Sequence, residues 1–292
     1  MSTNVTWAQE TKPVVAPRPV VNGGLPNVSP DGESIAFVSN RGGVNDLFVI
    51  SSNGTDEVQL THTPESESLA GWTRDGKQVL FSVFANEEST LYSISRDGKR
   101  QHEIARFPGR GPMPSPDLKW VVYMGGTWTA TRLMIFAMDG AQSQQITDGS
   151  SIAWNVRWSP DGKRLAFTGR AEPKSELAIF VLNSDGSARR QLTHIAPEEG
   201  GAQWPAWSPN GKEVALQVNN RALNNSAHIW IVNVATGESR KLGIHDTAYL
   251  DETPSWFPNG KRIAFQSNRT GQMETWIMNA DGSGQVQVTG KH

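Results

Sequence analysis

The sequence predicts an all-β fold, a six-bladed β-propeller with four antiparallel strands in each blade. One turn-and-strand motif, clearest as Ser-Pro-Asp-Gly-Lys-Arg-Leu-Ala-Phe over residues 159–167, occurs six times at intervals of 44, 42, 44, 49 and 49 residues. Each repeat also contains apolar runs for four strands, and repeats of this length and strand number are typical of propeller blades. No segment shows the 3.6-residue period of a helix.

Each repeat is predicted to form an antiparallel meander. In the fourth repeat, Asp161-Gly162 supplies the positive φ that a tight turn needs, and the alternation of Leu165 and Phe167 predicts a half-buried strand behind it. A third strand follows in each repeat, as at 46–50 and 274–278, and a second glycine turn leads to a fourth strand, as at 190–193. The strand that enters the turn often ends in tryptophan, which predicts packing between blades; these residues are Trp72, Trp158, Trp207 and Trp256.

The repeats define the predicted domain organisation. Residues 1–23 form an N-terminal extension whose three prolines keep its middle out of any central strand, and residues 24–292 form a single propeller. We expect Val5–Trp7 either to add to the outer edge of the last blade as a clasp or to stay outside the fold. The predicted blades are residues 24–61, 69–105, 111–147, 154–193, 204–242 and 253–289.

These motifs resemble those of a known family. The Trp-Ser-Pro-Asp-Gly-Lys core with Ala-Phe (158–167), the Ser-Asn-Arg loops (39–43 and 267–271) and the closing Arg-Gln-Leu-Thr (190–193) are similar to the propeller of TolB-type translocation proteins and their TolB-like relatives. The resemblance covers about residues 24–289. Two departures are expected: no separate α/β domain precedes the propeller, and Asp117-Leu118 replaces Asp-Gly in the third blade.

Composition excludes several classes of function. The net charge of −2 and the scattered basic residues argue against nucleic acid, and the absence of Cys excludes disulfides and thiolate metal sites. No segment is apolar enough to predict a membrane span, and residues 1–7 lack the features of a signal peptide. The resemblance implies a periplasmic or secreted mature form, with a cytoplasmic protein as the alternative.

Candidate binding residues gather on one face of the predicted ring. In a meander blade, the loop that enters the first strand and the loop between the second and third strands emerge on the same face, here called the channel-mouth face. Four aromatic residues near these loops depart from the repeat and suggest partner contacts, and the loops are rich in carboxylates. The predicted binding residues are Trp128, Trp154, Trp204, Tyr249, Glu198, Glu199, Asp251 and Glu252.

Two functions are compatible with this face. We favour a non-catalytic module without a cofactor that binds a protein or peptide partner; the resemblance implies an envelope lipoprotein as one such partner. The alternative is a metal-dependent lyase or hydrolase acting on oligosaccharides, as in some TolB-like relatives, with His62, His194 and His245 around a divalent metal ion at the channel mouth. The histidines share no metal-binding motif, and neither a G-x-S-x-G elbow nor a phosphate-binding glycine loop occurs, so we lean away from an enzyme.

Overall fold

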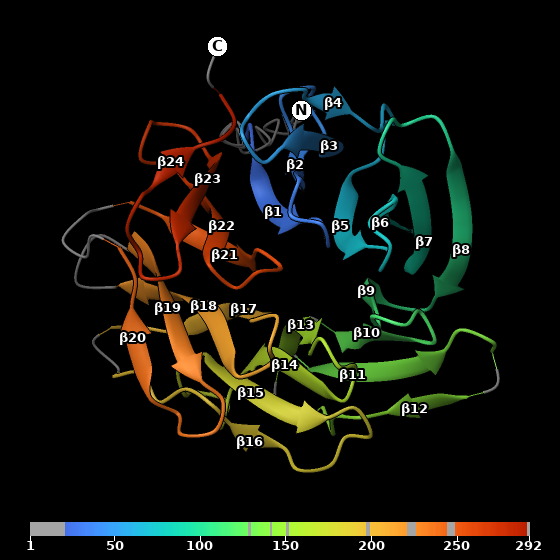
Figure 1. The fold of residues 1–292 in the computed structure, drawn as a ribbon. Helices are drawn as coiled ribbons and strands as arrows, with labels where there is room; N and C mark the ends of the chain where they lie inside the picture. The colour runs from blue at the N-terminus through green and yellow to red at the C-terminus, as the bar shows by residue number, and fades with distance from the viewer. Residues whose placement is uncertain are drawn as a thin grey trace, which may run out of the picture.

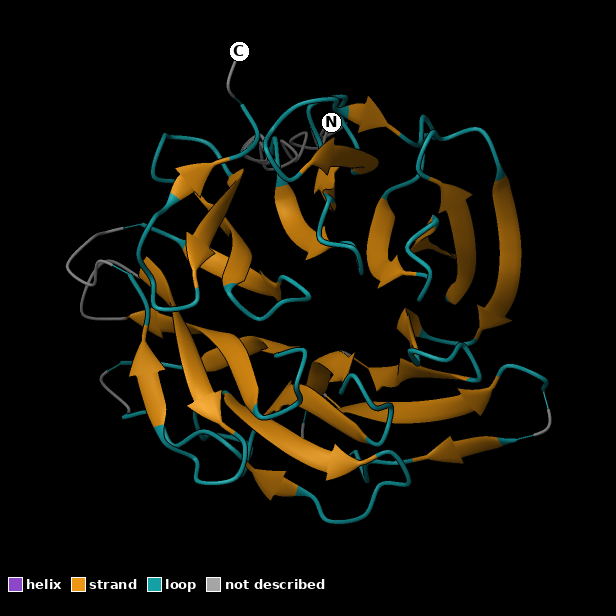
Figure 2. Ribbon diagram, in the orientation of Figure 1, coloured by secondary structure: helices purple, strands orange, loops and turns teal. Residues whose placement is uncertain are grey.

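The computed structural model describes residues 21–127, 130–140, 142–149, 152–196, 199–220, 226–243 and 249–290. These residues form 24 strands in six four-stranded sheets, without a helix among them (Figure 2). In every sheet, strands that lie side by side are antiparallel and consecutive along the chain. The six sheets surround a central opening (Figure 1). The predicted six-bladed propeller is therefore confirmed.

The blades follow one another along the chain. Blade one contains β1 (Gly24–Val28), β2 (Ser34–Ser39), β3 (Asp46–Ser51) and β4 (Val58–Gln59). Blade two contains β5 (Glu67–Trp72), β6 (Gln78–Ala85), β7 (Glu88–Ser95) and β8 (Gln101–Phe107). Blade three contains β9 (Arg110–Pro114), β10 (Trp120–Thr127), β11 (Ala130–Ala137) and β12 (Ser143–Gln145).

The second half of the ring has the same plan. Blade four contains β13 (Ala153–Trp158), β14 (Arg164–Gly169), β15 (Ala178–Asn183) and β16 (Arg190–Gln191). Blade five contains β17 (Ala202–Trp207), β18 (Glu213–Asn220), β19 (Ser226–Asn233) and β20 (Ser239–Lys241). Blade six contains β21 (Asp251–Trp256), β22 (Arg262–Ser267), β23 (Glu274–Asn279) and β24 (Val286–Gln287).

The Ser-Pro-Asp-Gly segments form the turns between first and second strands. In blade four, Ser159 Oγ donates to Asp161 Oδ1 at 2.5 Å, Lys163 N donates to the same oxygen at 3.1 Å, and Gly162 has a φ of 68°. The hydrogen bond from Ser159 lowers the pKa of Asp161 because it favours the ionised carboxylate. In the degenerate turn of blade three, Leu118 occupies the glycine position with a φ of 58°.

The four repeated tryptophans join neighbouring inner strands, as their spacing predicts. Each indole Nε1 donates to a backbone carbonyl of the preceding blade, and we call these bonds the tryptophan latches. They run from Trp72 to Asn27 O (3.0 Å), from Trp158 to Met113 O (2.9 Å), from Trp207 to Arg157 O (3.2 Å) and from Trp256 to Ala206 O (3.2 Å).

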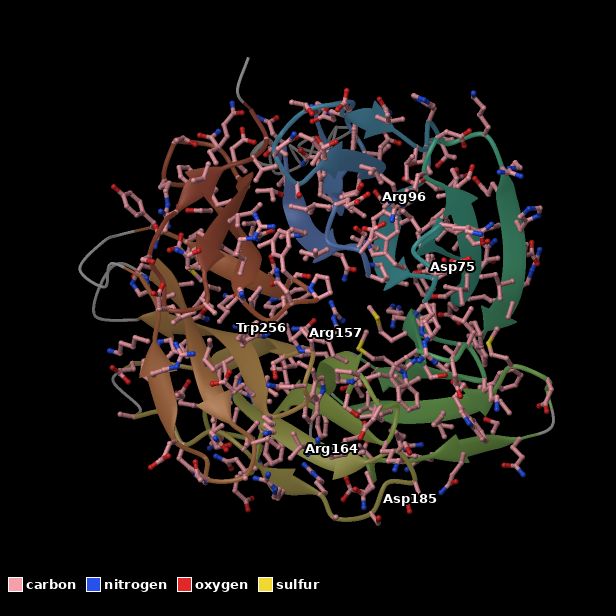
Figure 3. All side chains as sticks on the ribbon, in the orientation of Figure 1. Asp75, Arg96, Arg157, Arg164, Asp185 and Trp256 are labelled. Atoms are coloured by element: carbon pink, nitrogen blue, oxygen red, sulfur yellow. The ribbon has the colours of Figure 1, made fainter. Side chains whose placement is uncertain are left out.

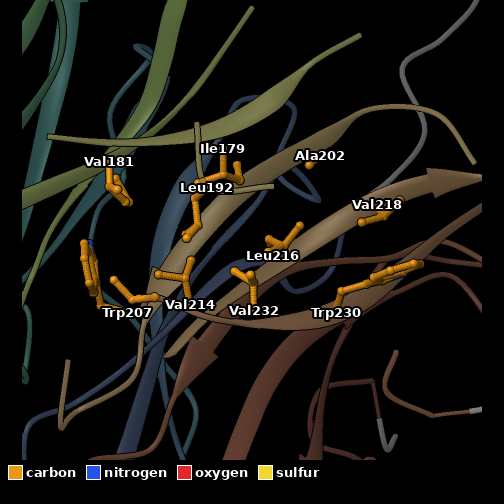
Figure 4. Close-up of a cluster of buried hydrophobic side chains, with 12 residues drawn as sticks. Ile179, Val181, Leu192, Ala202, Trp207, Val214, Leu216, Val218, Trp230 and Val232 are labelled. Carbon is orange, nitrogen blue, oxygen red and sulfur yellow. The ribbon is translucent and has the colours of Figure 1, made fainter. Parts of the chain in front are cut away.

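Apolar side chains fill the space between adjacent blades. Between blades four and five, Ile179 and Val181 of β15 pack with Leu216 of β18 and with Trp207 and Trp230 (Figure 4). The alternation along the strands places these side chains at the interface. Equivalent clusters occur around the ring, so the core consists of layers between blades.

The closing Gln-Leu-Thr motif has a structural role. Thr193 Oγ1 accepts a hydrogen bond from Ile179 N at 2.9 Å, and Gln191 Nε2 donates to Thr193 O at 2.7 Å. The same two bonds recur at Thr61 and Thr289. The motif thus fixes the short outer strand to its neighbour.

The ring closes where blade one meets blade six. Asn22 N and Gly23 N both donate to Met273 O at 3.0 Å, and Thr275 Oγ1 donates to Gly23 O at 3.2 Å. β1 also packs beside β21 and β22. The strands of blade six come only from residues 251–287, so residues 21–23 complete the closure without adding a strand to that sheet. The expected clasp at Val5–Trp7 lies outside the described residues.

Candidate functional site

The central opening contains a cavity of about 370 Å³ to which all six inner strands contribute. Its walls are mainly apolar and aromatic, as small-molecule and peptide sites usually are. Trp204 lies on the wall, together with three of the latch tryptophans. Residues of the wall include Leu25, Leu69, Met113, Met124, Asn155, Arg157, Trp158, Trp204, Trp207, Thr253 and Trp256.

The inner strands bend around this cavity through β-bulges. Leu25, Asn155, Trp204 and Thr253 have φ values of 52°, 52°, 53° and 51°, and strand pairing shifts in register beside each of them. Such left-handed conformations are costly for residues with a Cβ, and bulges re-aim side chains next to binding sites. Pro26, Pro205 and Pro254 directly follow three of these residues, and each lies four residues before a turn proline, so this spacing was an available signal in the sequence.

The carboxylates predicted at the channel mouth are engaged by neighbouring side chains. Arg269 Nη2 lies 2.7 Å from both oxygens of Asp251, and Lys241 Nζ lies 2.5 Å from Glu199 Oε1. Glu252 accepts hydrogen bonds from Gln217 Nε2 at 3.0 Å and Gln266 Nε2 at 2.8 Å. Burial raises the pKa of Glu252, and the two amides oppose that rise only in part.

The predicted aromatic residues occupy three different environments. Trp204, which we expected in or beside a loop, lies within β17 at its bulge and faces the cavity. The indole Nε1 of Trp154 is buried and has no hydrogen-bond partner among the described residues. Tyr249 is 39% exposed, and the guanidinium of Arg269 lies 5.7 Å from its ring centre. Trp128 and Glu198 lie outside the described residues.

The three histidines of the metal alternative are not brought together by the described structure. His62 and His194 are exposed, and Nδ1 of His194 lies 3.4 Å from Gln191 Nε2. His245 lies outside the described residues. Within the described ranges, no three His, Asp or Glu side chains are grouped so that they could hold a metal ion.

One residue of the wall was missed by the sequence analysis. Arg157, near the end of β13, is the only charged side chain in the described lining of the cavity, and it lies close to the central opening (Figure 3). Its Nη1 donates to Val156 O at 2.9 Å and lies 3.6 Å from Met113 Sδ. The sequence offered one signal for this residue. Arg157 is charged, whereas the residues at the equivalent position of the first strand in the other five blades are neutral.

Comparison with known proteins agrees with the fold and its motifs. The model of the TolB beta propeller domain matches residues 118–292. The chain belongs to this family. This TolB-type propeller is 24% identical over 198 residues to the uncharacterized protein Atu1656 of Agrobacterium fabrum. The aligned region covers 64% of this chain and 67% of that protein. It is 25% identical over 197 residues to the Tol-Pal system protein TolB of Anaeromyxobacter dehalogenans, covering 66% of the chain but only 42% of that protein.

Solved structures share the architecture at low sequence identity. TolB from Acinetobacter baumannii superposes with a TM-score of 0.70 at 19% identity, covering 91% of this chain and 63% of that one. An oligogalacturonate lyase from Vibrio parahaemolyticus superposes with a TM-score of 0.58 at 13% identity, covering 89% and 90%. These similarities concern the fold, which serves several functions. The described part of this TolB-type propeller contains no helix able to span a lipid bilayer.

Proposed function

We propose that this TolB-type propeller is a non-catalytic binding module that takes a protein or peptide partner at its channel-mouth face. One observation supports this most: the cavity wall is aromatic and apolar, with Trp204 on it, while Asp251, Glu252 and Glu199 at the mouth are bonded to neighbouring side chains. Aromatic side chains in a concave, largely desolvated site are the usual anchors of a protein interface. Carboxylates held by arginine, lysine and amides suit a scaffold better than acid–base chemistry.

The family suggests which partner to test first. Relatives named TolB belong to a Tol-Pal system, and the resemblance noted above implies an envelope lipoprotein as the partner and the periplasm, or the outside of the cell, as the compartment. A metal-dependent lyase or hydrolase with His62, His194 and His245 stays the alternative that the experiment must separate from this proposal.

Affinity capture from an envelope extract of the source cells tests the proposal. The baits are the wild type, Trp204→Ala and, as a control for an exposed apolar residue far from the channel, Val286→Ala, whose side chain is on the outer strand β24 and 54% exposed. We expect Trp204→Ala to reduce recovery of the captured lipoprotein at least about tenfold, as loss of an interface anchor does. Val286→Ala should recover as much as the wild type.

A fourth bait addresses the alternative function. The variant with His62, His194 and His245 all replaced by Ala should capture the partner as the wild type does. Equal recovery by Trp204→Ala and the wild type would contradict the proposed site. Recovery that is lost only with the histidine variant would favour a metal-centred site.

A further inference from the structure

The guanidinium of Arg157 is a cation without a carboxylate partner among the described residues. Its hydrogen bonds and close polar contacts are those to Val156 O and Met113 Sδ, a backbone carbonyl and a thioether. Burial lowers the pKa of this guanidinium to about 10, so the side chain stays charged at neutral pH. The side chain is only partly buried by its solvent exposure, and withdrawing its charge even in part from water is costly unless an opposite charge compensates it.

The fold itself does not require a cation at this position. In blade four, Arg157 pairs across the sheet with Ala166. The residues at the corresponding pairing positions of the other five blades are all neutral: Asn27, Gly71, Met113, Ala206 and Ser255. Five blades pack around the same channel with a neutral residue at this position. We therefore look for a role of the Arg157 charge other than packing of the blades.

We propose that Arg157 is the receptor for the C-terminal carboxylate of a polypeptide that enters the channel. This inference rests on the proposed binding function and names the chemistry of the group bound. A guanidinium presents its N–H groups in a planar fork that matches a carboxylate, and the pair is strongest where water is excluded. The ligand supplies the negative charge that the described residues of the channel lack.

The shape of the channel favours a chain end over an internal acidic residue. A cavity of about 370 Å³ is near the lower end of the range of ligand sites, about 300–1,000 Å³. A loop that presents an internal Asp or Glu must bring two lengths of polypeptide into this space, whereas a chain end brings one. Leu25, Leu69 and Trp204 on the wall can then cover apolar side chains of the last residues.

The acidic mouth does not prevent entry of an anion. Asp251 is paired with Arg269, and Glu199 is paired with Lys241, so these carboxylates are locally neutralised. Burial raises the pKa of Glu252, which favours its neutral form. The carboxylates that the sequence concentrates on this face therefore repel an incoming carboxylate less than their number suggests.

A peptide library with randomised side chains tests the assignment even while the natural partner is unidentified. A library of acetylated tetrapeptides with free carboxyl ends and the matching library of C-terminal amides are each incubated with the immobilised protein, and bound peptides are quantified by mass spectrometry. The wild type is compared with Arg157→Met and with Arg164→Met. Arg164 lies in the same blade (Figure 3) and outside the cavity lining. Its guanidinium donates to Gly211 O and stacks over the ring of Trp207.

We expect the wild type and Arg164→Met to recover free acids at least tenfold more than amides, and Arg157→Met to recover both equally. Equal recovery of acids and amides by the wild type, enrichment of neither, or acids retained by Arg157→Met would overturn the proposal. Amides with internal Asp or Glu that bind through Arg157 would overturn the assignment to a chain end.

The melting temperature of the free protein provides a second measurement. Because the guanidinium has no compensating charge, Arg157→Met should melt at the same temperature as the wild type or higher. A melting temperature lowered by several degrees would show that Arg157 is needed for folding, and would overturn its assignment as a receptor. Should Arg157→Met still capture the lipoprotein that Trp204→Ala loses, the binding module would stand and the carboxylate site alone would fail.

Discussion

At the scale of the residue, Leu118 departs from the repeat because it occupies a turn position that glycine fills in the other five blades. In the turns of blades one, two, four, five and six, a glycine follows Asp or Asn and has a positive φ, for example 68° at Gly162 and at Gly260. Leu118 adopts the same conformation, with a φ of 58°. The turn still forms because Ser115 Oγ donates to Asp117 Oδ1 at 2.6 Å and Leu118 N donates to Ser115 O at 2.9 Å.

Replacing Leu118 with glycine should stabilise the protein by about 1 kcal/mol. The left-handed conformation destabilises a residue with a Cβ by about 1–2 kcal/mol, and glycine avoids this cost. Part of the gain is lost because glycine is more flexible in the unfolded chain. Urea denaturation at equilibrium measures the difference. Gly162→Ala, at the equivalent position of blade four, is the matched control and should destabilise the protein. Destabilisation by Leu118→Gly would show that the leucine side chain contributes packing that outweighs the backbone strain.

At the scale of the element, the tryptophan latch holds the inner strand of four blades beside the inner strand of the preceding blade. Blades one and three lack a tryptophan at this place, where Val28 and Pro114 pair with Ile35 and Val121. At the junction of blade one with blade six, which precedes it in the ring, a different bond takes the place of a latch: Val28 N donates to Ser255 Oγ at 3.1 Å. The latches therefore link four of the six junctions between inner strands.

Trp207→Phe should destabilise the protein by about 2 kcal/mol, since it leaves Arg157 O without its donor and reduces the packed volume. Trp276→Phe is the control, because the Nε1 of Trp276 is buried without a hydrogen-bond partner among the described residues. This control loses volume but no hydrogen bond, and should cost about 1 kcal/mol less. Equal costs in chemical denaturation would show that the latch bond contributes nothing to stability.

At the scale of the whole molecule, the ring depends on the contact between residues 21–23 and β23. Gly23 sits so close to blade six that an added Cβ would lie 2.5 Å from Thr289 Oγ1 and 2.9 Å from Thr275 N. The backbone atom cannot move away without disturbing the bond that Thr275 N donates to Thr289 Oγ1 at 2.9 Å. The closure is thus made of tightly packed backbone.

Gly23→Ala should destabilise the protein by about 1–3 kcal/mol, as overpacking of a tight contact does. Gly42→Ala serves as the control, because its added Cβ would meet only Asp46 Oδ2, at 3.4 Å. Differential scanning calorimetry compares the two variants. A melting temperature of Gly23→Ala equal to that of Gly42→Ala would mean that the ring remains closed without this contact.

The sequence predicted the blades well because their determinants are local and repeated. The Asp-Gly turns, the alternating strands and the tryptophans each act within a few residues or between equivalent positions, so six copies reinforce one interpretation. The site was predicted less well. The sequence predicted Asp251 and Glu252 at the mouth, but it did not predict which side chains bind them. Gln217 and Gln266 lie on other strands and Arg269 in the turn after β22, and their bonds make the two carboxylates less available to a ligand. Arg157, which we propose as the carboxylate receptor, was not among the predicted residues, because we sought candidates in and beside loops whereas it projects from a strand of the repeat.

The direction of the tryptophan latches has a consequence for biosynthesis. Each donor lies later in the chain than its acceptor, as with Trp207 in blade five and Arg157 O in blade four. A nascent chain leaves the ribosome with its N-terminal part first, so a later blade meets acceptor carbonyls that are already in place. Assembly can then proceed in the order of translation, and the junction of blade one with blade six must wait for the sixth blade. That junction joins residues far apart in the chain, as in the bond between Thr275 and Gly23, which are about 250 positions apart.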